Sequence, residues 1–224
     1  MVVGSKREIN RESPRPGRPK EKRAGYEITT AVAEDIAWIA RLEADSYAPE
    51  DAVPEHVLAE WFSVNPTGFN IVRAHDGHRV GHIDILPLRP AALSAFAVGK
   101  IIEREIRGDF LYTPAERDLI HDLYVESVII PRAEGCSNAP AVRHVLLNLI
   151  AVVERICDPS KVKNTYAVAA SKAGERGLKH LGFDRLKSGH GKPDRHDLFV
   201  AKFPVLAARL SALKTNRTRG VSSS

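Results

Sequence analysis

A strand, a short polar loop and a long apolar helix follow one another between His121 and Ile156. Residues 123–130 (LYVESVII) are rich in β-branched side chains and predict the strand. The helix is predicted to begin near Ala139 and Pro140, because proline suits the first helical turn. The unpaired N–H groups and the positive end of the helix dipole then face the loop, so this unit predicts an anion site whose natural occupant is a phosphate.

The loop has the spacing Arg132-x-x-Gly135-x-Ser137. This spacing resembles the pyrophosphate loop of the GNAT acetyltransferase superfamily, Gln/Arg-x-x-Gly-x-Gly/Ala, which holds the pyrophosphate of acetyl-CoA. Ser137 departs from that pattern, and Pro131 directly precedes Arg132, where the family usually has other residues between the proline and the arginine. The alternative interpretation is an ordinary surface loop with a glycine in a turn.

A second segment carries the same resemblance. Residues 166–170 predict a short strand, and the helix after it ends in Leu181-Gly182-Phe183, as the fourth helix of the superfamily typically does. Gly182 is predicted to be a left-handed C-cap, with Phe183 holding the next strand against the core. Twelve residues before this phenylalanine, where the family usually has an asparagine, the chain has Ser171.

The remaining elements are predicted from hydrophobic periodicity and turn signals. They are strands over 26–30, 68–74, 79–86, 183–186 and 196–203, and helices over 30–46, 54–65 and 204–213. A strand, two helices and then a hairpin is also how the superfamily begins. The resemblance implies a mixed α/β fold, with a mainly antiparallel central sheet, one splayed parallel pair of strands and helices on both faces. Residues 196–203 are interpreted as an edge strand through which a homodimer could form.

One domain between two basic tails is predicted. The 224 residues, 43% of them hydrophobic, suffice for one sizeable core and not for two comfortable domains. Residues 1–24 contain eight Lys/Arg and three Glu and are predicted to be a disordered basic tail. Residues 25–203 form the GNAT-like domain, with a helical insertion over 91–120 that covers the substrate side, and residues 204–224 add a terminal helix and a second basic tail.

Within the first tail, residues 15–20 (RPGRPK) resemble an AT-hook, a short minor-groove reader built on Arg-Gly-Arg-Pro. In that motif the glycine lets the backbone enter the groove while the arginines lie along its floor. Pro16 replaces the first arginine of the core motif, and the alternative is a solvated basic tail. Binding of nucleic acid by residues 1–24 alone would be strongly salt-dependent and would vanish when they are removed.

The resemblance implies that acetyl-CoA or another acyl-CoA is the co-substrate. The strand would offer backbone N–H and C=O groups to the pantetheine arm, and the loop amides would face the pyrophosphate beside an arginine. The residues at these positions are Val128 and Ile130 in the strand, Arg132, Gly135, Cys136 and Ser137 in the loop, and Ser171 in place of the asparagine.

Acyl transfer to an amine requires alignment, removal of a proton from the ammonium and protonation of the leaving thiolate. Glu126 lies in the middle of the strand, predicted on the same side as Tyr124, Val128 and Ile130, and is the candidate base. A structural carboxylate satisfied by a partner is the equal alternative for Glu126. The family's usual thiolate-protonating tyrosine is replaced here by Leu178, so Tyr124 and Tyr166 are the candidates to take its place.

No metal site is predicted. His75, His78 and His82 resemble a ligand set, but two of them flank the predicted hairpin turn and are expected to point into solvent. The only two cysteines, Cys136 and Cys157, fit a reducing compartment. No apolar run approaches the length of a membrane span, and the charged N-terminus contains no signal-peptide stretch, so the expected location is the cytoplasm, without membrane contact.

Two functions follow from the resemblance. The first is an N-acyltransferase that moves an acetyl or other acyl group from acyl-CoA to an amine. The alternative is a catalytically silent acyl-CoA sensor or regulatory protein of the same fold, which contacts nucleic acid or a protein partner through its basic tails. Leu178 and Ser137 favour the silent protein, whereas Gly135 and the long helix after it favour retained binding of the cofactor.

Overall fold

The computed structural model describes residues 25–132, 137–189 and 195–219, with side chains described as far as 215. The AT-hook-like segment of residues 15–20 lies outside the described residues. So do Gly135 and Cys136 of the predicted pyrophosphate loop.

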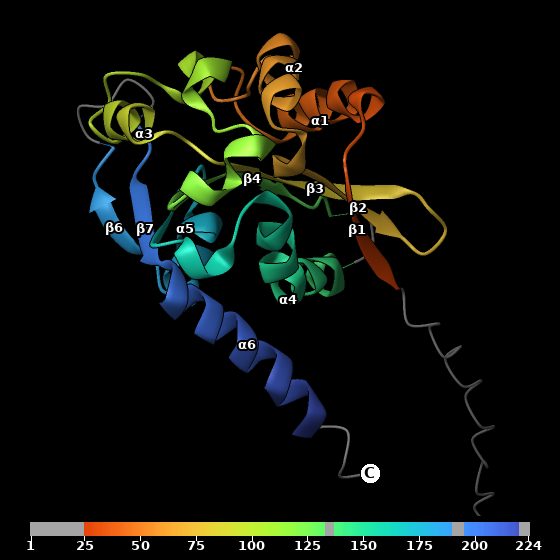
Figure 1. Ribbon diagram of the computed structural model, residues 1–224. Coiled ribbons are helices and arrows are strands. Elements are labelled where there is room, and N and C mark those ends of the chain that lie inside the picture. The colour runs from red at the N-terminus through yellow and green to blue at the C-terminus, as the bar shows by residue number, and fades with distance from the viewer. Residues whose placement is uncertain (1–24, 133–136, 190–194, 220–224) are drawn as a thin grey trace, which may run out of the picture.

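One seven-stranded sheet, in the order β1-β2-β3-β4-β5-β7-β6, forms the middle layer of the described chain (Figure 1). The strands are β1 (Tyr26–Thr30), β2 (Phe69–Ala74), β3 (Arg79–Leu86), β4 (Asp122–Ile129), β5 (Asn164–Val168), β6 (Asp184–Lys187) and β7 (Leu198–Lys202). β4 and β5 are parallel, and the other neighbouring pairs are antiparallel. The predicted mixed α/β class, with a mainly antiparallel sheet and one parallel pair, is confirmed.

Helices cover both faces of the sheet (Figure 1). One layer contains α1 (Ala33–Ser46), α2 (Glu55–Val64) and α3 (Pro90–Ala97), and the other contains α4 (Ala139–Ile156), α5 (Lys172–Leu181) and α6 (Phe203–Arg219). Each layer buries its own apolar cluster against the sheet, with Trp61 and Phe96 in the first and Val152 and Leu206 in the second. No helix among the described residues combines the length and the apolar character needed to span a bilayer.

The parallel strands separate part of the way along. β4 pairs with β5 from Asp122, opposite Asn164, to Val125, opposite Ala167. Beyond Val125 the β5-facing edge of β4 has no strand partner among the described residues, so the predicted splay is present. A free strand edge offers N–H and C=O groups that an extended ligand can pair with.

A bulge lies in β4 at this same point. Ser127 pairs with Asp84 of β3, and Val125 pairs with the next residue of β3, Ile85, so Glu126 is an extra residue in β4. A bulge of this kind breaks the alternation of side chains and turns the residues around it. It therefore determines which side chains of β4 reach the α1–α3 layer.

The bulge corrects one prediction about the strand. Tyr124 packs into the cluster under α1–α3, whereas Val128 lies opposite Ile83, whose side chain belongs to the cluster under α4–α6. Ile130 also packs against the cluster under α4–α6. The prediction that Glu126 and Tyr124 share a face with Val128 and Ile130 is therefore wrong for these two residues. The extra residue reverses the side-chain alternation beyond it.

Two further elements differ in detail from expectation. Residues 91–120 contain α3 followed by three short 3₁₀ turns, Glu103–Glu105, Gly108–Phe110 and Pro114–Leu119. The strand predicted over 196–203 is β7, which lies between β5 and β6 and is not at the edge of the sheet. The interpretation of that segment as an edge strand available to a homodimer is therefore wrong, because β6 folds back and covers it.

Candidate active site

A cavity of about 500 Å³ opens where β4 and β5 separate. Its walls come from the end of α1, from α3 and the turn after it, and from the segment after β5. Ionisable side chains dominate the lining: Glu50, Asp51, Glu103 and Glu126 are acidic, and Arg104, Arg195 and His196 are basic. Asp51 is paired with His196, at 2.9 Å between Oδ1 and Nε2.

Glu126 enters this cavity from the bulge in β4. Its Oε2 is buried and has no hydrogen-bond partner among the described residues. Burial first, and then the charges of Glu43, Glu103 and Asp84, raise the pKa of Glu126 well above its ordinary value. A buried carboxyl group beside other acids is stabilised by a cation or a proton that enters the cavity.

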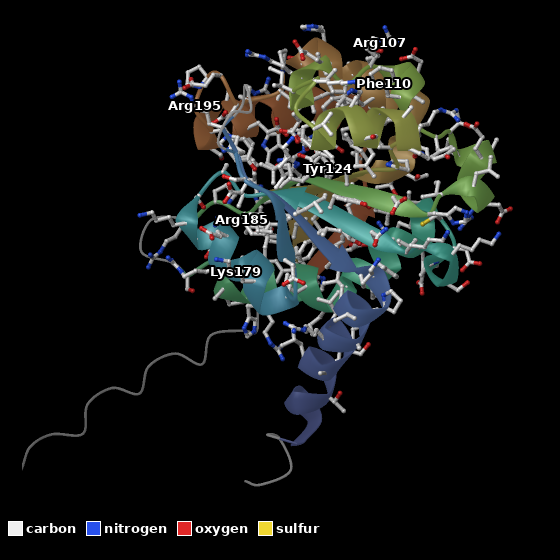
Figure 2. All side chains as sticks on the ribbon, turned by 90° about the vertical axis from the view of Figure 1, so that its left-hand side faces the viewer. Arg107, Phe110, Tyr124, Lys179, Arg185 and Arg195 are labelled. Carbon is white, nitrogen blue, oxygen red and sulfur yellow. The ribbon has the colours of Figure 1, made fainter. Side chains whose placement is uncertain are left out.

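Tyr124, the second predicted catalytic residue, does not line the cavity. It is fully buried on the sheet beneath the α1–α3 layer (Figure 2), with its ring 5.0 Å from that of Phe96. Its hydroxyl donates a hydrogen bond to Glu103. Burial, followed by the charge of Glu103, raises the pKa of Tyr124 well above its ordinary value. Tyr124 therefore holds Glu103 in place at the cavity wall.

The tyrosine that does line the cavity was not identified from the sequence. Tyr47, directly after α1, shares a hydrogen bond of 3.1 Å with the hydroxyl of Ser127 on β4. Burial and the charge of Glu126 raise the pKa of Tyr47. Tyr47 and Ser127 are 80 residues apart, so no local pattern could join them. Tyr166 and Leu178 instead pack partly buried against the two apolar clusters.

The described ends of the predicted pyrophosphate loop are held together. The side-chain amide of Asn138 donates to the carbonyl oxygen of Ile130 at 2.7 Å, which joins the end of β4 to the start of α4. α4 begins at Ala139, as predicted, and its first N–H donates to Oγ of Ser137 at 3.2 Å. Ser137 and Arg132 are exposed. One lone pair of the Ile130 carbonyl is thus already used.

Ser171 is the N-cap of α5, since its Oγ accepts a hydrogen bond from the N–H of Gly174 at 3.0 Å. It also lines a smaller cavity of about 250 Å³, which shares Arg195 and His196 with the larger one. At the other end of α5, Gly182 has a φ of +92° and Phe183 is buried, as the Leu-Gly-Phe pattern predicts. Val128, 44% exposed, lies on the free part of β4.

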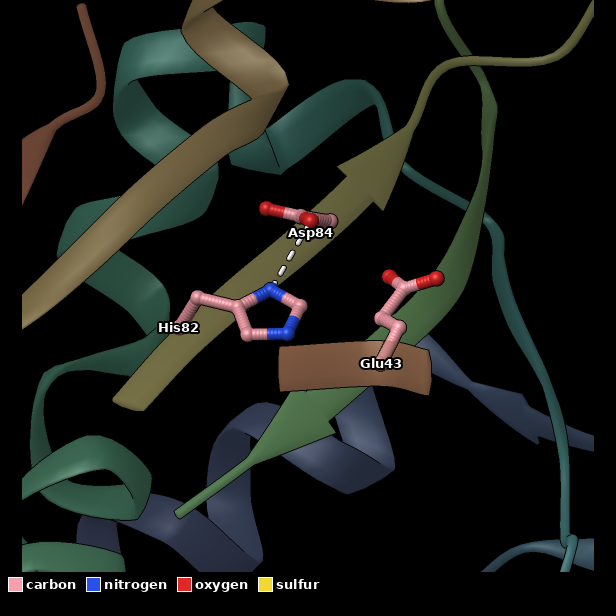
Figure 3. Close-up of side chains that lie close together, drawn as sticks. All are labelled: Glu43, His82 and Asp84. Carbon is pink, nitrogen blue, oxygen red and sulfur yellow. Dashed lines mark hydrogen bonds and ion pairs between the residues drawn. The ribbon is translucent and has the colours of Figure 1, made fainter. Parts of the chain in front are cut away.

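A buried polar cluster lies between α1 and β3 (Figure 3). It consists of Glu43 from α1 and of His82 and Asp84 from β3, each 0% exposed. Nδ1 of His82 is 2.9 Å from Oδ2 of Asp84, and Glu43 Oε2 accepts a hydrogen bond of 3.3 Å from the N–H of Val53. Burial, followed by the charges of Asp84 and Glu103, raises the pKa of Glu43 to about 9.

The three histidines that resemble a ligand set are separated in the fold. His75 and His78 flank the turn between β2 and β3 and are exposed, as expected, whereas His82 points into the protein. Any role of His82 in binding therefore involves Glu43 and Asp84, and not the other two histidines.

Several solved structures share this fold, although no family model and no curated protein matches the sequence. The loading GNATL domain of CurA from Lyngbya majuscula has a TM-score of 0.52 at 15% identity, over 80% of this chain and 98% of that domain. The GphF GNAT-like decarboxylase in complex with isobutyryl-CoA has a TM-score of 0.52 at 16% identity, over 79% of this chain and 99% of the decarboxylase chain. An acetyltransferase of the GNAT family from Staphylococcus aureus has a TM-score of 0.51 at 9% identity, over 80% of this chain and 99% of the acetyltransferase chain. The predicted resemblance to the GNAT superfamily is confirmed in the fold.

Proposed function

We propose that this chain, which has the GNAT fold, is an N-acyltransferase that transfers an acyl group from acyl-CoA to an amine. The observation that carries the proposal is the position of Glu126. The bulge in β4 places its carboxylate in the cavity at the point where the parallel strands separate. One structure with this fold, the GphF GNAT-like decarboxylase, holds isobutyryl-CoA, which supports an acyl-CoA as co-substrate.

The acyl-CoA is proposed to lie along the free edge of β4 beyond Val125. The pantetheine arm would pair with backbone groups of Val128 and Ile130, and the pyrophosphate would meet the N-terminus of α4, where the helix dipole favours an anion. The Ile130 carbonyl would take part through its remaining lone pair. The other residues proposed to contact the cofactor are Arg132, Gly135, Cys136, Ser137 and Ser171.

The charge of the cavity supports a cationic acceptor. Glu50, Glu103 and Glu126 line it together with the paired Asp51, against Arg104 and Arg195. An amine arrives as an ammonium ion and supplies the positive charge that these carboxylates lack.

The proposed reaction begins when Glu126 accepts a proton from the bound ammonium, directly or through a water molecule. The neutral nitrogen attacks the thioester carbonyl, and the thiolate of CoA leaves. The hydroxyl of Tyr47, which lines the cavity, is proposed to protonate that thiolate in place of the tyrosine that Leu178 replaces. The nitrogen loses its second proton as the amide forms, and this proton restores the hydroxyl of Tyr47. Tyr124 has a positioning role, because its hydroxyl holds Glu103 at the cavity wall.

Calorimetry with acetyl-CoA and isobutyryl-CoA, followed by a thiol-release assay over a panel of amines, tests the proposal. The expected result is a heat of binding together with thiol release that depends on an amine. A heat of binding without thiol release for any amine would support the catalytically silent sensor. Absence of binding to both thioesters would overturn the assignment of an acyl-CoA site.

The pH dependence of turnover tests the role of Glu126. Its raised pKa means that the ionised, proton-accepting form increases as pH rises through and above the ordinary range for glutamate. We expect log kcat/KM to rise with pH on a slope of about one until Glu126 is ionised. The same amine is used with Glu126→Gln, whose profile shows the slope that protonation of the acceptor contributes by itself. A flat profile would rule out Glu126 as the base.

A further inference from the structure

We propose that Glu43, His82 and Asp84 bind one divalent transition-metal ion inside the protein. The site is distinct from the acyl-CoA cavity and does not depend on the proposed function. His82 and Asp84 are two residues apart on β3 and face the same layer, and Glu43 approaches them from α1 (Figure 3). Each residue contributes one potential ligand atom, and these atoms all lie within 4.8 Å of one another.

The first argument is that three polar atoms of the cluster lack hydrogen-bond partners. Oε1 of Glu43, Nε2 of His82 and Oδ1 of Asp84 are buried and have no hydrogen-bond partner among the described residues. Folded proteins pair nearly all buried polar atoms. Ionised carboxylates accept hydrogen bonds and do not donate them, so either an added proton or a cation is needed to satisfy these atoms. A cation satisfies all of these atoms at once.

The second argument is charge. A divalent ion at this position would be held by two carboxylates and one imidazole, and all three side chains are 0% exposed. An unpaired charge in such a place is costly, and buried charges are normally paired or bound to a metal. The charged groups that act on Glu43 and Glu126 in this region are themselves acidic, namely Asp84 and Glu103. A divalent ion balances the charge of the three ligands.

The ligand types and spacing indicate which metal. One imidazole with two carboxylates suits Zn²⁺, Mn²⁺, Fe²⁺ or Co²⁺, whereas Ca²⁺ and Mg²⁺ prefer oxygen ligands throughout. The 2.9 Å between His82 Nδ1 and Asp84 Oδ2 is a hydrogen bond, and a carboxylate partner on one ring nitrogen orients the other nitrogen, here Nε2, toward a metal. Tetrahedral ligands about 2.0–2.2 Å from one ion are about 3.3–3.6 Å apart, so ligand atoms that lie within 4.8 Å of one another need to close by about 1.5 Å or less.

The experiment measures metal retained by the full chain. Protein stripped with a chelator is loaded with Zn²⁺ or Co²⁺, dialysed, and analysed for metal by mass spectrometry, and the Co²⁺ form is examined for visible absorption bands. We expect about one ion per chain, and a Tm higher by about 5–11 °C at a hundredfold excess of free Zn²⁺ over Kd. Glu43→Gln and His82→Gln, which keep similar side-chain volumes, are expected to retain less than about a tenth of an ion.

Two controls separate this site from adventitious binding. Asp45→Asn removes one negative charge from the exposed side of α1 and is expected to retain metal like the wild type. The double variant His75→Ala/His78→Ala removes the exposed histidines of the β2–β3 turn and is expected to do the same. The proposal is wrong if the wild type retains no metal, in which case protons neutralise the cluster. It is also wrong if Glu43→Gln, folded by circular dichroism, retains as much as the wild type.

Discussion

Replacing Glu126 with glutamine is expected to lower kcat for acyl transfer by about 10²–10⁴-fold, the usual contribution of a positioned general base. Glutamine keeps the shape of the side chain but cannot accept the ammonium proton. The KM for acyl-CoA should change little, because the proposed contacts to the thioester come from the backbone of β4 and from the loop before α4. Steady-state thiol release at saturating amine, with wild type and variant compared at one pH, measures the effect.

Glu50→Gln is the matched control for this variant. Glu50 lines the same cavity as Glu126, and its replacement by glutamine is the same change of side chain. Glu50, however, is exposed and does not lie on the β4 bulge. We expect a higher KM for the amine, through weaker attraction of the cation, and a kcat within about threefold of the wild type. If Glu126→Gln also keeps the wild-type kcat, Glu126 is not the base. It is then a structural carboxylate, which was the alternative interpretation of its position in the strand.

Features that depend on neighbouring residues were predictable from the sequence. The start of α4 at Ala139, the C-cap at Gly182 and the first strand, Tyr26–Thr30, all agree with the structure, since each depends on local backbone preferences and periodicity. The splay of the parallel pair was predicted from the family resemblance and not from the residues themselves. Its presence beyond Val125 confirms the fold assignment.

The parts of the site that depend on distant contacts were not predictable. Glu43 meets His82 and Tyr47 meets Ser127 only after α1 packs on the sheet, and nothing in their local patterns marks either pair. The bulge at Glu126 also has no sequence mark, because no glycine or proline interrupts the strand there. Simple alternation therefore placed Val128 on the wrong face. The helices and strands could therefore be predicted from local sequence, whereas the side chains that meet in the site are brought together only by tertiary packing.

Replacing Gly81 with alanine is expected to be strongly destabilising, because β3 approaches β4 too closely there for a side chain. An added Cβ would lie 2.3 Å from the carbonyl oxygen of Ile129 and 2.9 Å from Cγ1 of Ile130. The obstacle is mainly backbone, so the two strands must move apart, which we expect to lower the free energy of unfolding by about 3 kcal/mol and Tm by about 6–12 °C. Thermal and denaturant unfolding followed by circular dichroism measure these changes.

The same substitution links stability to binding. Ile129 ends β4 and Ile130 directly follows it, beyond the bulge, where the pantetheine arm is proposed to lie. Their displacement should raise the Kd for acetyl-CoA by about tenfold at a temperature where the variant is folded. Gly177→Ala is the control, because a Cβ in that exposed turn of α5 meets nothing within 4 Å. It should stabilise the helix by about 0.5–1 kcal/mol and leave the Kd unchanged. Weakened binding in Gly81→Ala alone would support the free edge of β4 as the cofactor slot, whereas unchanged binding in a destabilised Gly81→Ala would place the thioester elsewhere.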